Sequence, residues 1–139
     1  MINIYDNKKK QKIATTDQDW VVPHIEVIIS PSKNGASFGN GEHNGKKAII
    51  NSVSGPHNVT IRLLDANSKP SSEVMTISAE YLQPVRPEKK QNLIVIAGEY
   101  KGQRGQLIGI DVGDGIVKLE GGLDFKIMTM SLLAKLADA

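Results

Sequence analysis

The stretch EYKGQRGQLIGIDVGDGIVKLEG, residues 99–121, limits the possible fold more than any other part of the chain. It holds six glycines, and its two apolar runs flank a Gly-Asp-Gly turn without a helical period. Glycine destabilises a helix interior but is favoured where a chain turns sharply. A phosphate-binding loop or a dinucleotide fingerprint needs a helix directly after its glycines. Because strands are expected on both sides here, the stretch predicts a tightly curved β-sheet.

The glycines of this stretch have expected positions in such a sheet. We expect Gly102 and Gly105 to flank a tight turn between two strands, where a side chain would not fit. Gly113 and Gly115 are assigned to the next hairpin, with Asp114-Gly115 as its turn pair.

The sequence also contains an internal repeat. Three short segments match at spacings of 57, 56 and 53 residues, so the length differences fall in loops. The match makes Gly45 the turn glycine equivalent to Gly102, whereas Ala48 stands where the second copy has Gly105. The matching pairs are Asn44–Lys47 with Lys101–Arg104, Ile61–Leu63 with Val117–Leu119, and Val74–Ser78 with Ile127–Ser131.

Alternating apolar residues predict mainly strands after residue 19. A serine at the start of two short segments, Ser78 and Ser131, predicts a single helical turn at the end of each copy. Short strands without a helix long enough to cover a sheet favour closed barrels. We therefore predict an all-β chain of two small five-stranded SH3-like (KOW or Tudor-like) barrels in tandem, each ending in a short helical turn. The expected strands are residues 20–29, 48–53, 59–64, 74–77, 93–98, 106–110, 116–119 and 125–130.

The same pattern predicts the domain boundaries. Residues 1–18 have few apolar side chains and are expected to form a flexible lead-in. Residues 19–86 are expected to form the first barrel, which is divergent and carries a long polar loop over 30–44. Residues 87–139 form the second barrel, and the proline-rich and charged residues 84–90 read as a linker.

Composition excludes several classes of function. Cysteine is absent, so disulfides, thiolate catalysis and thiolate metal sites are excluded, which fits an intracellular protein. Lys and Arg number 17 against 15 Asp and Glu, and beyond Lys8–Lys10 there is no basic stripe. Any nucleic-acid contact is therefore expected to be local. No apolar run is long enough to span a membrane.

No catalytic or metal-binding set is visible in the sequence. His24, His43 and His57 are scattered without the paired spacing of a metal site. No activated serine can be identified either. We therefore expect no catalytic residues, no metal, no cofactor and no small-molecule substrate.

The candidate binding residues lie at the two equivalent turns. Lys46 and Lys47 follow Gly45 in the first copy, and Tyr100, Lys101 and Arg104 surround Gly102 in the second. Arginine can form two hydrogen bonds to a phosphate or carboxylate, and tyrosine can stack on an unpaired base.

The other aromatic residues read as packing residues. Trp20, the only tryptophan, is expected to close a barrel end or fill the joint between the modules. Tyr81 and Phe125 are expected to make core or inter-module contacts.

The second copy resembles a known motif. Residues 102–110, GQRGQLIGI, followed by 116–119, IVKL, are similar to the KOW motif of NusG-type elongation factors and some ribosomal proteins. The segments DWVVPHIEVII, GKKAIINSVSG, ISAEYLQPVRPEKKQNLIVIAGE, IDVGDGIVKLEG and LLAKLADA resemble the C-terminal end of the large subunit of DSIF, a eukaryotic transcription elongation factor. This resemblance covers residues 19–139 and implies the last two KOW domains of that subunit.

Three functions follow as hypotheses. The resemblance implies a non-catalytic, nuclear module that docks onto the RNA polymerase II elongation complex and onto elongation or processing factors. Alternatively, the module binds single-stranded RNA and contacts the nascent transcript, although the balanced charge favours a protein partner. A reader of modified histone tails would need a cage of aromatic side chains around a cation, and the six aromatic residues are spread along the chain.

Overall fold

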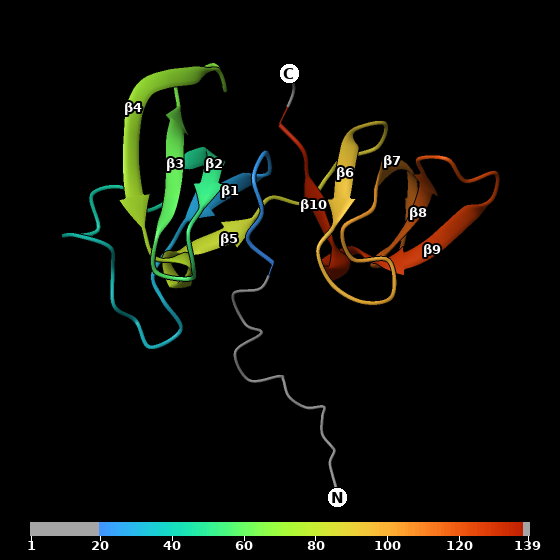
Figure 1. Cartoon of the computed structure of the whole chain (residues 1–139), viewed down its shortest axis with the longest axis horizontal. Coiled ribbons are helices and arrows are strands. Elements are labelled where there is room, and N and C mark those ends of the chain that lie inside the picture. Colours follow the sequence, from blue (N-terminus) through green and yellow to red (C-terminus); the bar gives the residue numbers. More distant parts are fainter. Residues whose placement is uncertain (1–19, 138–139) are drawn as a thin grey trace, which may run out of the picture.

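The computed structural model describes residues 20–137, and the predicted lead-in over residues 1–18 lies outside the described part. It contains two five-stranded antiparallel sheets and two 3-10 turns, which confirms the predicted all-β class. The two sheets form separate lobes that are joined near the middle of the molecule (Figure 1). No helix in the described part is long and apolar enough to cross a membrane.

The first sheet has the strand order β4-β3-β2-β1-β5. Alternation in β3 explains how its core forms, because Val59, Ile61 and Leu63 are buried while the residues between them are partly exposed. A 3-10 turn, η2 (Ala79–Tyr81), leads into the last strand. The strands are β1 (Glu26–Ile29), β2 (Lys47–Val53), β3 (Val59–Leu64), β4 (Pro70–Ile77) and β5 (Leu82–Pro84).

The second sheet has the equivalent order β10-β6-β7-β8-β9. Its core includes Leu93, Leu107, Val117 and Leu133, one from each of four strands. A 3-10 turn, η3 (Met130–Leu132), again precedes the last strand. The strands are β6 (Asn92–Val95), β7 (Arg104–Asp111), β8 (Asp114–Leu119), β9 (Phe125–Thr129) and β10 (Leu133–Lys135).

The internal repeat extends to irregularities in the sheets. The register between β2 and β3 shifts between Ile50 and Ser52, and that between β7 and β8 shifts between Leu107 and Gly109. These two bulges occupy equivalent positions, 57 residues apart. A bulge bends its strand and increases the local twist, so both sheets curve at the same place.

One predicted correspondence was misplaced by two residues. Val74 pairs with Arg62, and Phe125 pairs with Lys118, which is the residue equivalent to Arg62. Val74 therefore corresponds to Phe125 rather than to Ile127. The segments 74–77 and 125–130 both contain several apolar residues and no glycine. Their sequence similarity therefore did not determine which residues of the two modules correspond.

Several element boundaries also differ from the prediction. The first strand begins at Glu26, because Pro23 has no N–H and His24 has a φ of 79°. The segment Leu82–Pro84, where no strand was predicted, is strand β5, and Leu133–Lys135, predicted as helical turn, is strand β10. Three-residue strands are too short to give a periodic signal.

The predicted serine caps are not made. Ser78 precedes η2 without a side-chain capping bond, and its hydroxyl instead donates to the carbonyl of Pro56 at 3.3 Å. Thr129, rather than Ser131, precedes η3, and it also makes no capping bond.

The hairpin between β7 and β8 turns two residues earlier than predicted. Asp111 pairs with Asp114, so the turn residues are Val112 and Gly113, with φ values of 42° and 83°. Two consecutive positive φ angles are typical of a type I′ turn. Gly115 lies within β8, where an added Cβ would be 2.9 Å from the Leu107 Cδ1.

The two sheets share contacts beyond the linker. Ile25 and Leu136 form an isolated antiparallel bridge, and Ala137 donates its N–H to the His24 carbonyl at 2.8 Å. Glu26 is 5% exposed, and its Oε1 lies 3.1 Å from the Lys135 Nζ. Four residues of the second module belong to the same buried cluster as the core of the first, namely Ile94, Ile96, Ala134 and Leu136.

Candidate binding site

The two KOW turns, residues 41–47 and 98–104, have the same backbone hydrogen bonds. Gly45 and Gly102 have φ values of 86° and 93°, and their N–H groups donate to the carbonyls of Ile29 and Val95, each at 2.7 Å. A positive φ favours glycine because a Cβ would be strained there. His43 occupies the position of Tyr100, because the backbone carbonyl of each accepts the N–H of the residue three positions later.

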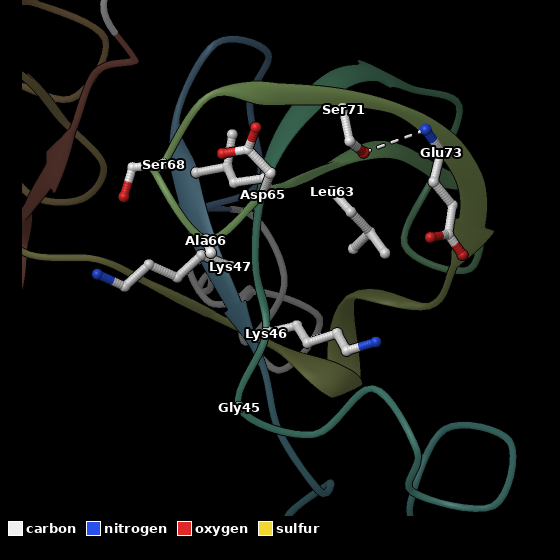
Figure 2. Close-up of a pocket in the computed structure, with 10 residues that line it drawn as sticks. Gly45, Lys46, Lys47, Leu63, Asp65, Ala66, Ser68, Ser71 and Glu73 are labelled. Carbon is white, nitrogen blue, oxygen red and sulfur yellow. Dashed lines mark hydrogen bonds between the residues drawn. The ribbon is translucent and has the colours of Figure 1, made fainter.

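The first turn borders a cleft of about 590 Å³. Leu63 contributes an apolar side chain, and Lys46, Lys47, Asp65 and Glu73 contribute charges of both signs (Figure 2). A cleft that contains charges of both signs is complementary to a protein surface that also carries both signs. It is less complementary to a nucleic-acid backbone, in which every phosphate is negative.

Lys46 and Lys47 extend to opposite sides of the strand in Figure 2. The Lys46 Nζ lies 3.5 Å from the His43 Nδ1. The Lys47 Nζ lies 3.9 Å from a carboxylate oxygen of Glu26. The two lysines therefore do not act as one paired cation, and Lys47 belongs partly to the joint between the modules.

The second turn borders a smaller cleft of about 290 Å³. Tyr100 lines it, and the Lys126 Nζ lies 5.7 Å from the centre of the tyrosine ring. This cation–π contact already occupies one face of the ring. An unpaired base would have to use the other face or displace Lys126.

Lys101 and Arg104 line separate grooves on the joint between the modules. Arg104 borders one of about 460 Å³ with His24 and Leu136, whereas Lys101 borders one of about 440 Å³ with Trp20. The structure thus places Tyr100, Lys101 and Arg104 along one turn but in three different clefts.

Arg86 fastens the linker to the second module. Its Nη1 donates to the carbonyls of Leu133 at 2.8 Å and Ser131 at 3.1 Å. Partial burial of the guanidinium lowers the pKa of Arg86 from its ordinary value. Arg86 also lines the Lys101 groove, where Trp20 packs against the shared core.

Sequence reasoning missed the charged residues of the joint. Glu26 stands inside an apolar strand sequence, which signals a carboxylate that needs a buried partner. Its partner Lys135 gave no signal, because it lies 109 positions later in a segment predicted as a helical turn. Among residues 20–137, no group of His, Cys, Asp or Glu could hold a metal ion.

Comparison with known proteins identifies the second module. Residues 85–136 match the family model of the seventh KOW domain of the transcription elongation factor SPT5. The Arabidopsis thaliana protein described as transcription elongation factor SPT5 homolog 1 is 33% identical over 116 residues, which is 84% of this chain and 10% of that protein. SPT5 homolog 2 of the same plant is 44% identical over 52 residues, 37% of this chain and 5% of that protein.

A further relative has a different description. The human DNA/RNA-binding protein KIN17 is 27% identical over 104 residues, which is 75% of this chain and 24% of KIN17. The chain spans a tenth or less of the length of the two SPT5 relatives. Residues 85–136 are therefore a KOW domain of the SPT5 family, and the chain is homologous to SPT5 proteins over most of its length.

Proposed function

We propose that this chain is a docking module of an SPT5-type transcription elongation factor, which binds the RNA polymerase II elongation complex and associated factors in the nucleus. KOW domains of SPT5 are non-catalytic binding modules. The observation that carries the proposal is the mixed charge of the first-turn cleft, which Lys46, Lys47, Asp65 and Glu73 all line. Alternating charges recognise a protein surface of complementary pattern.

The joint supports the same proposal. Because Lys135 and Glu26 pair across it and the modules share a buried cluster, both modules can present their clefts at once. Two weak contacts made by one body bind more tightly than either contact alone.

A direct binding measurement tests the proposal. Purified RNA polymerase II elongation complex would be immobilised, and the full chain would be titrated over it by biolayer interferometry. We expect saturable binding that is retained when the nascent RNA is trimmed away. Glu73→Lys should weaken it at least tenfold, whereas Lys69→Ala, a nearby change outside the cleft lining, should not. Binding that is absent, or indifferent to the charge reversal, would contradict the proposal.

Binding of single-stranded RNA is the second candidate function. It is favoured by the exposed Lys101 and Arg104 beside Tyr100, and by the similarity to a protein described as DNA/RNA-binding. Fluorescence anisotropy with labelled RNA at two salt concentrations distinguishes it. If the second turn binds RNA, Lys101→Ala with Arg104→Ala should weaken binding and flatten its salt dependence. An unchanged salt slope would exclude this turn as the RNA contact.

A further inference from the structure

The edge strand β9 of the second module carries larger and more exposed apolar side chains than the equivalent strand β4 of the first module. Phe125 and Ile127 are 59% and 74% exposed, and Leu123, just before the strand, is 94% exposed. Phe125 was expected to make core or inter-module contacts, and the structure instead places it on the surface. Buried Met128 and partly buried Lys126 point to the other face, as alternation in a strand requires.

The outer face beside β9 continues this apolar surface. Ile127 pairs with Ile116 of β8, and Phe125 pairs with Lys118. At the equivalent positions in the first module, Val74 and Thr76 replace Phe125 and Ile127, and Ser72 replaces Leu123. The backbone plan is shared, so the apolar surface is a property of the second module's side chains rather than of the fold.

The backbone of β9 is also open on one side. The strand is last in the order β10-β6-β7-β8-β9, so its only neighbour among the described strands is β8. Met130 donates its N–H to the Gly113 carbonyl, which directs the even-numbered residues of this segment toward β8. The N–H and C=O groups of Phe125 and Ile127 therefore face the open edge.

The same two residues thus offer both side chains and backbone groups. Exposed apolar edge strands promote aggregation, and proteins usually protect them with charges, prolines or a covering segment. A peptide that adds a strand to such an edge gains main-chain hydrogen bonds, and its alternate side chains pack beside those of the edge strand.

We propose that β9 is a docking edge for an extended segment of another protein, which adds to the sheet as a sixth strand. The segment has apolar side chains at two alternating positions, which pack beside Phe125 and Ile127. It carries a carboxylate at the Phe125 end, because Lys118 is the exposed charge opposite Phe125 on that face. This surface is distinct from the KOW turns, so the inference stands independently of the polymerase proposal.

Designed peptides test the proposal on the full chain. The probe is a ten-residue peptide with apolar residues at alternating positions and glutamate at one end, titrated into ¹⁵N-labelled protein. We expect shift changes centred on residues 125–129 and slower exchange of the Phe125 and Ile127 amide protons. Lack of any change at millimolar peptide would overturn the proposal. So would changes confined to the KOW turns.

Matched variants test whether the peptide pairs with the backbone of β9. Phe125→Val with Ile127→Thr copies the first module's edge onto the second and should weaken binding at least tenfold. Lys118→Glu should reverse the preference between peptides ending in glutamate and in lysine. A peptide N-methylated at the amides that would pair with β9 should not bind. If the methylated peptide binds as tightly as the unmethylated one, pairing with the edge of β9 is overturned. If the unmodified protein self-associates and the double variant does not, the edge binds a second copy of this chain, and the assignment to another protein is overturned.

Discussion

The two modules differ at the residue that directly follows the KOW turn. Ala48 is fully buried in the first module, whereas in the second a Cβ on Gly105 would lie 2.5 Å from the backbone oxygen of Lys118. The neighbouring strand therefore approaches more closely in the second module. The turn, the bulge and the strand order are nevertheless the same in both. The repeat has kept its backbone plan while strand spacing and surface side chains diverged.

The largest expected effect concerns the core that the modules share. Leu136→Ala removes a buried side chain that packs with the first module although it follows the last strand of the second. We expect it to lower the free energy of unfolding by about 2–5 kcal/mol. Under urea, intrinsic Trp20 fluorescence and amide signals of the second module should shift together. The control is Leu107→Ala, which removes a side chain from the second module's own core. If Leu136→Ala destabilises only one of the two modules, the shared core does not join them into one cooperative unit.

The residue after each turn gives the next effect. Gly105→Ala should destabilise the second module by about 1–3 kcal/mol, because its Cβ overlaps the Lys118 carbonyl. The reciprocal Ala48→Gly should cost the first module only about 0.5–1 kcal/mol through backbone entropy. Chemical denaturation of both variants measures the difference. Equal losses would mean that the strand spacing is alike in the two modules.

The hairpin turns allow a stabilising change. Val112 is β-branched yet has a φ of 42° in a type I′ turn, a position that favours asparagine. Val112→Asn should raise the free energy of unfolding by about 1 kcal/mol. Val53→Asn, in strand β2 of the first module, should show no such gain. A thermal melt of each variant decides this, and a destabilised Val112→Asn would argue against the turn type.

The ion pair across the joint should have an effect no larger than that of the hairpin turn. Glu26 and Lys135 lie 3.1 Å apart, and the carboxylate is buried while the lysine is partly exposed. A double-mutant cycle with Glu26→Gln and Lys135→Met should give a coupling energy of about 1 kcal/mol. The same cycle with Glu26 and Lys47, whose Nζ lies 3.9 Å from the Glu26 carboxylate, should give a smaller coupling energy. A larger coupling for Lys47 would reverse the assignment of the main partner.

The sequence predicted the fold well where its pattern was local. Alternation located most of the longer strands, and the glycines marked both KOW turns. It failed where the cause was distant or short: β5 and β10 have three residues each, and the Glu26–Lys135 pair joins opposite ends of the described chain. The candidate binding residues were grouped because they are neighbours in the sequence. In the structure, Tyr100, Lys101 and Arg104 line three different clefts. Phe125 was misjudged because apolarity alone does not distinguish a core residue from an exposed edge.

One measurement decides whether the two modules present their surfaces as a single body. Backbone ¹⁵N relaxation of the full chain gives a rotational correlation time for each module separately. Shared core residues and the Ile25–Leu136 bridge predict one common value for residues of both sheets. Two distinct and shorter values would show that the modules tumble independently and would contradict a joint built on a shared core.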